Sequence, residues 1–476
     1  MRESAHLLHG NDVELEVGSP YEEEKESTNL RLFDFRRLSL LLLKHGILSF
    51  LALASSKVQK RHEYTAALDG LRGFSAFIVV TYHWFLFFYD MNAGYIPGTE
   101  HAKWTNLPFI KFFTNGIASV AIFFTISGYA LSYKPLKLER AKSWEKLNHT
   151  LSSSVFRRAL RLYLPSLFNM FCLSILFWLG VNEPGRQHIE EAWLGAGWYP
   201  PRPESLGSAI GEFIRVAAQL GNAWTWDAYR PTELDSNMWT ILTEFRTSMV
   251  LFLVLLGLCK VRRTLRLALF TAAAFWALYG GRWEVVLFLV GSVLADVDLE
   301  ADSRQMDRAG STGSPLRHVL IWSAITLVGI FLSSSPLSGS AVGYGSIMWF
   351  GKQVYPAEPQ WFSWTLGATV LVYAATKANF LQRVLTSNII QYLGHISYSM
   401  YIVHGALLRI VAYNFVPFLW RIWGREGVGY ACGAIVGYFV GVAVLIPIAD
   451  IFWRMVDAPS IRFAKWMESK FFVDDG

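Results

Sequence analysis

Apolar runs follow one another along most of this chain, separated by polar stretches. Each run approaches the roughly 20 residues that an α-helix needs to cross the hydrocarbon core of a bilayer. The runs lie near residues 70–90, 114–133, 160–181, 238–259, 265–281, 283–297, 317–333, 362–378, 389–412 and 429–453. Ionisable residues interrupt several of them. The pattern predicts an all-α, polytopic membrane protein of about ten transmembrane helices around a polar cavity.

Composition agrees with a lipid bilayer as the main partner. Of the 476 residues, 53% are hydrophobic and only 17% are charged, which argues against a set of soluble domains. The net charge of +6 would suggest nucleic acid in a soluble chain, but here the cations gather in loops: residues 134–161 hold eight Lys and Arg, and 91–107 hold one. This asymmetry is typical of the positive-inside rule. We therefore expect no nucleic-acid partner, cytosolic termini, and residence in an endomembrane such as the ER or in the plasma membrane.

The chain divides into three predicted parts. Residues 1–60 form a cytosolic N-terminal tail, in which the short apolar stretch 38–54 is predicted to be an interfacial helix, with an additional span as the alternative. Residues 61–465 form the transmembrane domain, and 466–476 form a cytosolic C-terminal tail. The three cysteines lack ligand-like spacing, so we expect no metal site.

Two ionisable residues stand out in the first predicted span. Arg72 lies at its entrance and His83 eleven positions later, so both project from nearly the same helix face, about 16 Å apart. An imidazole inside a span usually faces a bundle interior or a watery cavity. It can accept a proton near neutral pH, or it can be a polar packing residue bonded to a neighbouring helix.

LDGLRG followed by VVTYH resembles the opening helix of the acyltransferase-3 family, membrane-bound O-acyltransferases of bacteria and fungi. That family has an Arg, ten residues and then a His on its first core span, which Arg72 and His83 match. The resemblance extends over residues 64–465 in five blocks that occur in the right order. It implies catalytic roles for both residues, with His83 as the general base.

The second and third spans carry further blocks. FFTISGYALS is similar to the family's FF-x-x-SG, where Ser127 and Gly128 would allow close helix packing, and the Ser127 hydroxyl could instead line the cavity. FRRALRLYLP opens the third span. Arg158 and Arg161 share one helix face, and arginine is a residue type suited to binding phosphates. Arginines at a helix end can also simply determine the orientation of the helix in the membrane. The RxxR spacing matches the family pattern and implies binding of the donor, acyl-coenzyme A.

The fourth span contains Glu244, which must find a partner on another helix because Arg246 faces elsewhere. We expect His83 or Arg72 as that partner. The family has a Trp, a short gap and a Glu here, so the resemblance implies a catalytic role for Glu244, orienting His83 or stabilising its protonated form. A structural ion pair is the alternative.

QYLGHISYSMYIVHGALL, in the ninth span, is similar to the family's G-x-x-SYSLYLxH. It places four polar residues, Ser397, Tyr398, Tyr401 and His404, along one helix face, which should therefore face the cavity. We assign Tyr398, Tyr401 and His404, together with Ser127, to binding of the acyl-coenzyme A donor, with acceptor binding or interhelical hydrogen bonds as the alternatives. Asp457-Ala458-Pro459 replaces the family's usual Glu-x-Pro, and we assign it no role.

The predicted activity is acyl transfer, most simply of acetyl, from acyl-coenzyme A to a hydroxyl of a carbohydrate or a small secondary metabolite, with no permanently bound cofactor. Arg72 would stabilise the donor phosphates or the thioester oxyanion. A polytopic transporter or proton-coupled carrier suits the same buried charges. The aromatic-rich loop 182–237 could hold an acceptor or only anchor at the interface.

Overall fold

The computed structural model describes residues 63–189, 200–226, 232–307, 315–337, 341–356 and 358–472, and these residues contain helices but no strand. The predicted N-terminal tail and its interfacial helix lie outside the described residues. The helices are α3 (Glu63–Leu86), α4 (Gly116–Arg140), α5 (Trp144–Trp178), α6 (Glu183–Arg186), α7 (Leu206–Gly221), α8 (Trp239–Leu258), α9 (Arg263–Tyr279), α10 (Trp283–Asp307), α11 (Pro315–Ser333), α12 (Gly345–Val354), α13 (Gln360–Lys377), α14 (Asn379–Leu385), α15 (Asn388–Trp423), α16 (Gly427–Phe452) and α17 (Ala458–Phe471).

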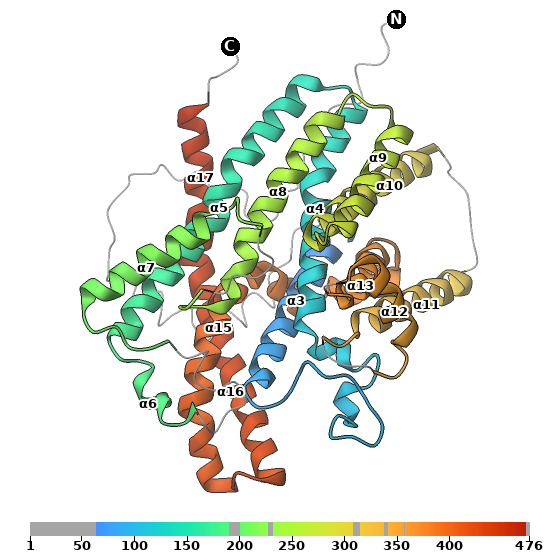
Figure 1. Ribbon diagram of the computed structural model, residues 1–476. Coiled ribbons are helices and arrows are strands. Elements are labelled where there is room, and N and C mark those ends of the chain that lie inside the picture. The colour runs from blue at the N-terminus through green and yellow to red at the C-terminus, as the bar shows by residue number, and fades with distance from the viewer. Residues whose placement is uncertain are drawn as a thin grey trace, which may run out of the picture.

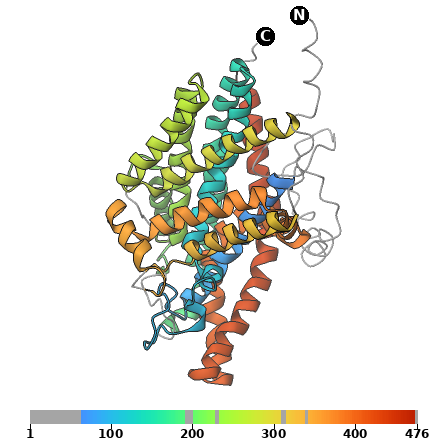
Figure 2. The same ribbon diagram turned by 90° about the vertical axis from the view of Figure 1, so that its right-hand side faces the viewer.

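A helix overlaps each of the ten predicted apolar runs. Among the described residues, six helical segments are long and apolar enough to cross a membrane: Gly116–Arg140, Trp144–Trp178, Ser236–Leu258, Leu316–Ser333, Asn388–Trp423 and Gly427–Phe471. The helix that carries Arg72 and His83 is not one of these six. In Figure 2 the orange α13 lies across the direction of the red α16. The all-helical fold is confirmed for the described residues, and six of their helical segments, rather than about ten, meet the length and hydropathy of a membrane span.

The connections between helices lie at both ends of the bundle. The α4–α5 and α8–α9 connections lie at the top of Figure 1, and the α15–α16 connection lies at the bottom with α6. The cation-rich segment 134–161 is thus at the top. The long segment between α5 and α8 contains α7, whose start is fixed by a capping box in which Ser205 and Ser208 satisfy each other's backbone N–H groups.

α3 lies at the centre and is in backbone contact with α15. A Cβ on Gly73 would lie 2.1 Å from the backbone nitrogen of Gly394, and a Cβ on Gly394 would lie 2.5 Å from the carbonyl oxygen of Asp69. Only glycine allows this separation. The contact occurs next to Arg72, and farther along the two helices His83 meets His404. Gly73 of LDGLRG and Gly394 of α15 therefore set the distance between the two helices that carry much of the site.

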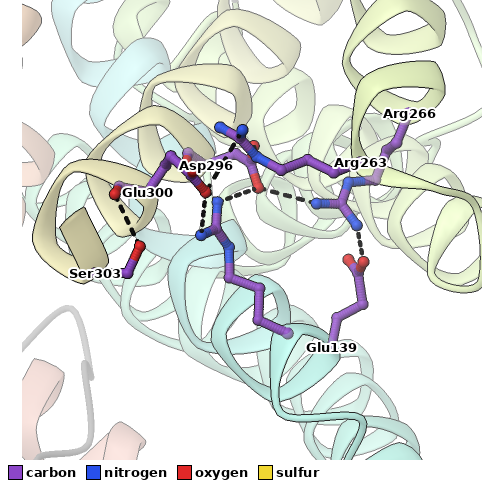
Figure 3. Close-up of polar contacts among 7 residues, drawn as sticks. Glu139, Arg263, Arg266, Asp296, Glu300 and Ser303 are labelled. Atoms are coloured by element: carbon purple, nitrogen blue, oxygen red, sulfur yellow. Dashed lines mark hydrogen bonds and ion pairs between the residues drawn. The ribbon is translucent and has the colours of Figure 1, made fainter. Parts of the chain in front are cut away.

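Ion pairs join α4, α9 and α10 near the top of the bundle (Figure 3). Asp296 of α10 is fully buried and accepts hydrogen bonds from Arg140, Arg263 and Arg266 at 3.0, 2.8 and 2.9 Å. Glu300 adds contacts to Arg140 and Arg263, and Glu139 pairs with Arg266. Three cations and three carboxylates thus offset one another where three helices meet.

The C-terminal residues are part of the bundle. After α16 the chain forms a π-helical turn, η6 (Trp453–Asp457), and continues as α17, which packs against α5. Arg157 of α5 pairs with Glu468 of α17 at 3.1 Å. Residues 466–471, which we predicted to begin a tail, belong to α17. Such a π-turn often occurs at a functional site, and this one ends at Asp457.

Candidate functional site

A cavity of about 90 Å³ lies among α3, α4, α5, α8, α15 and η6. Seven of the nine predicted site residues line it: Arg72, Ser127, Arg158, Arg161, Glu244, Tyr398 and Tyr401. The described lining does not include the other two, His83 and His404. Five helices thus bring predicted site residues to one cavity, whereas both imidazoles lie outside its lining, and His83 contacts His404 of a neighbouring helix, as its alternative role predicted.

Glu244 pairs with Arg158. Glu244 Oε1 accepts hydrogen bonds from Arg158 Nη2 at 2.7 Å and from the Ser127 hydroxyl at 3.0 Å, while Arg158 Nε donates to the Ser248 hydroxyl at 2.9 Å. Our expectation that Glu244 contacts His83 or Arg72 is wrong, because α5 rather than α3 presents the nearest cation to this part of α8. The carboxylate fixes the direction of the Arg158 guanidinium.

Ser127 and Gly128 together fulfil both roles predicted for their motif, lining the cavity and allowing close helix packing. The hydroxyl lines the cavity, whereas a Cβ on Gly128 would lie 2.3 Å from the carbonyl oxygen of Phe288 on α10. Because neighbouring residues of a helix point in different directions, one face of α4 packs against α10 and the next turns to the cavity.

Arg72 enters the cavity from α3 and is held by α15. Its Nε donates to the Ser397 hydroxyl at 3.0 Å and its Nη2 to the Gly394 carbonyl at 3.2 Å. Asp69, one turn earlier on α3, forms an ion pair with it at 3.4 Å. These contacts leave the guanidinium at the cavity wall in a fixed orientation.

Asp457 is a cavity residue to which the sequence analysis gave no role. It is 6% exposed, lines the cavity from η6, and lies within electrostatic reach of Arg161 and Arg72. The Asp-Ala-Pro block was the available signal, and the π-turn that aims the side chain inward could not be read from the sequence. The charged lining thus consists of Arg72, Arg158 and Arg161 against Glu244 and Asp457.

The two tyrosines anchor helices as well as lining the cavity. The Tyr398 hydroxyl donates to the Leu162 carbonyl of α5 at 2.8 Å. The Tyr401 hydroxyl lies 2.8 Å from the Thr240 hydroxyl of α8. The interhelical hydrogen bonds that we considered as the alternative role are therefore present at both positions.

His83 and His404 form a pair beyond the cavity. His83 Nδ1 lies 3.0 Å from His404 Nε2, and the ring centroids are 5.0 Å apart. The Tyr401 ring lies against that of His404, with centroids 5.4 Å apart, and it also lines the cavity. Tyr401 is therefore the side chain shared by the cavity and the imidazole pair.

The turn before α8 packs against the same part of α15. Asp235 is fully buried there, and its Oδ1 accepts from the Asn237 backbone N–H at 3.0 Å. Burial raises the pKa of Asp235 to about 6, which the nearby Arg409 guanidinium partly opposes. A Cβ on Gly405 would lie 2.2 Å from Asn237 Nδ2, so only a glycine at this position leaves room for the turn to pack against α15.

Arg246, two residues after Glu244, is directed away from the cavity. It pairs with Glu284 of α10 at 3.2 Å and stacks over the Trp226 ring at 4.3 Å. Part of the aromatic segment before α8 therefore packs against α8. In the described part of the chain, no group of three His, Cys, Asp or Glu side chains could hold a metal ion.

The site thus has a cavity with three guanidiniums, and an imidazole pair farther along α3 and α15. Guanidiniums bind phosphate groups, and a neutral imidazole can accept a proton from a hydroxyl. Arg72 and His83 are eleven residues apart on one helix, which corresponds to about 16 Å along its axis. A single ligand could use both parts only if it were elongated.

Comparison with known proteins gives consistent matches. The model of the acyltransferase-3 family, described as an acyltransferase domain, matches residues 65–454. An "O-acetyltransferase PaAT-1" of Phomopsis amygdali is 29% identical over 440 residues, 86% of each chain. "Acyltransferase clz18" of Cochliobolus lunatus is 24% identical and "Acyltransferase R4" of a Phoma species is 25% identical, each over 83% of this chain and 94% of the relative. No solved structure matches.

Proposed function

The chain belongs to the acyltransferase-3 family, and from this premise we propose that it transfers an acetyl group from acetyl-coenzyme A to a hydroxyl of a carbohydrate or small secondary metabolite. Acyl transfer follows from the family itself. The acetyl group is supported by the name of the relative from Phomopsis amygdali, an O-acetyltransferase. The donor is supported by the site.

The proposed setting is a bilayer crossed about ten times, in an endomembrane or the plasma membrane. The Lys- and Arg-rich connection at the top of Figure 1 favours the cytosol at that end. Both termini would then be cytosolic, and the cavity with the arginines would receive its donor from that side.

The observation that carries the donor assignment is the convergence of Arg72, Arg158 and Arg161 on one cavity. Coenzyme A carries several phosphates, and guanidiniums form charge-assisted, often bidentate bonds with them. Glu244 and Asp457 offset part of this charge but leave the lining with one excess cation. The Glu244 pair holds the Arg158 fork in place before the donor arrives, which limits the entropy lost on binding.

The imidazole pair would supply the proton chemistry. The extended pantetheine arm of coenzyme A separates its phosphates from its thioester, so phosphates at the arginines allow the thioester to approach His83. The acceptor oxygen attacks the thioester carbonyl carbon while His83 takes the hydroxyl proton. The carbon–sulfur bond then breaks, and the imidazolium returns the proton to the departing thiolate. General-base assistance of this kind contributes about 10²- to 10⁴-fold in rate.

Binding of radiolabelled acetyl-coenzyme A to the purified protein tests the donor site. Arg158→Ala and Arg161→Ala should each raise the dissociation constant about 10- to 100-fold, because a charge-assisted hydrogen bond contributes about 1.5–3 kcal/mol. Arg157→Ala is the matched control: Arg157 neighbours Arg158 on α5 but pairs with Glu468, away from the cavity lining. Equal dissociation constants for the Arg157 and Arg158 variants would remove the arginines from the donor site, and no binding by the wild type would refute the donor.

A further inference from the structure

The structure assigns His404 a role other than the one its sequence motif suggested. We propose that His404 is a positioning residue, which holds His83 in the tautomer and orientation that leave its Nε2 atom free to act as the base. The inference rests on the proposed function, since it concerns the base of that reaction. His404 is fully buried and is not among the residues that line the cavity.

The hydrogen bonds of His404 determine which of its nitrogens carries a proton. His404 Nδ1 lies 2.6 Å from the backbone carbonyl oxygen of Tyr401. A carbonyl oxygen only accepts, so Nδ1 must be the protonated nitrogen. In a neutral ring the other nitrogen, Nε2, is then an acceptor.

The tautomer of His83 follows from that of His404. Because His404 Nε2 accepts, the atom 3.0 Å away, His83 Nδ1, must donate. His83 Nε2 is therefore the unprotonated nitrogen, with its lone pair available to a hydroxyl. The chain from the Tyr401 carbonyl through His404 to His83 is the arrangement in which a second group fixes the base. A carbonyl cannot pass a proton onward, so His404 orients His83 and does not relay its proton.

The position of His404 is itself fixed from two sides. Gly405, the next residue, admits the turn before α8, since an added Cβ would lie 2.6 Å from Asp235 Oδ1. Tyr401, one turn earlier, is bound to Thr240 of α8. Contacts on both sides of His404 thus hold this part of α15 to α8, and its imidazole cannot rotate away without breaking the bond to the Tyr401 carbonyl.

Substitutions that keep or remove the acceptor atom test the proposal. In His404→Gln the amide oxygen can occupy the position of Nε2 and accept from His83 Nδ1. In His404→Leu the volume is similar but the acceptor is lost. Initial rates of labelled acetyl transfer would be measured against acetyl-coenzyme A, with a small-molecule extract of the gene-deletion strain as the source of acceptor. His404→Leu should lower kcat about 100-fold or more with a donor KM within about threefold of wild type, and His404→Gln should recover to within about tenfold.

A third variant keeps the test decisive if His404→Leu fails to fold. His404→Asn retains an amide, but its side chain ends too early to reach His83, so kcat should fall as it does in His404→Leu. Wild-type kcat in His404→Asn, or an equal loss in folded His404→Gln and His404→Leu, would overturn the proposal. A raised donor KM with unchanged kcat would also overturn it, because His404 would then act in donor binding. His83→Ala tests the proposed function separately from the role of His404. If this variant remains active, His83 is not the base, whatever His404 does.

Discussion

Replacing Asp296 by Asn should destabilise the protein more than any other single charge removal in its ion-pair cluster (Figure 3). The carboxylate is 0% exposed and accepts from three guanidiniums, one of which, that of Arg266, is 1% exposed. An Asn amide offers one acceptor oxygen and turns an NH₂ group toward a cation. Because three guanidiniums, one of them buried, would then face only the Glu139 and Glu300 carboxylates, we expect a loss of about 3–5 kcal/mol of stability.

Glu300→Gln is the matched control within the same cluster. Glu300 contacts two of the same arginines, Arg140 at 3.0 Å and Arg263 at 3.5 Å, but its side chain is 26% exposed. Water therefore screens its interactions, and the expected loss is about 0–1 kcal/mol. Both variants conserve side-chain shape and remove one negative charge, so the difference between them isolates the effect of burial.

Thermal unfolding of the detergent-purified variants, followed by loss of the monodisperse size-exclusion peak after heating, measures the effect. Asp296→Asn should lower the midpoint clearly and Glu300→Gln only slightly. Radiolabelled acetyl-coenzyme A binding per folded molecule should be unchanged in both, because neither residue lines the cavity. Equal midpoints for the two variants would refute the burial argument.

Two further predictions concern packing and protonation. Gly73→Ala should destabilise the protein by about 1–3 kcal/mol, because its Cβ would meet the Gly394 backbone. Gly211→Ala on α7 is the control: its Cβ would meet nothing within 4 Å, so it should stabilise the protein by about 0.4–1 kcal/mol. Equal shifts in melting temperature for the two variants would contradict this prediction. Lys111, on the α3–α4 connection, is buried, and burial lowers its pKa from 10.5 to about 8. Above about pH 8 the unfolded chain keeps a Lys111 proton that the folded protein releases, so the stability of wild type relative to Lys111→Met should rise with pH. A flat or falling difference in melting temperature would count against it.

The sequence predicted the helices and most of the cavity because both depend on local pattern. Apolar runs of membrane length locate the helices, and a polar side chain inside such a run is driven toward the interior whichever helix it meets. Glu244 and Tyr401 were identified for this reason, whereas Arg158, which precedes its apolar run, was identified by the RxxR spacing of the family. Which of them pair could not be predicted, since pairing depends on how α5, α8 and α3 cross.

The assignment of His404 to the cavity failed for a geometric reason. Tyr398, Tyr401 and His404 follow one another at three-residue intervals and so share a face of α15. The cavity extends along that face only as far as Tyr401, and the next turn is covered by His83 and the turn before α8. Helical periodicity predicts the face of a helix but not where along it a cavity ends.

The contacts between α3 and α15 also limit what the proposed reaction can use as a donor. Arg72 is bound to Ser397 and His83 to His404, so the two helices run side by side in the same direction through the site. The roughly 16 Å rise along α3 between the backbone positions of Arg72 and His83 is therefore fixed by packed helices. Under the proposed reaction, a donor whose phosphates bind at the arginines must carry its acyl group at the end of a long arm to reach His83. Coenzyme A thioesters meet this requirement, and acyl phosphates, whose two groups are adjacent, do not.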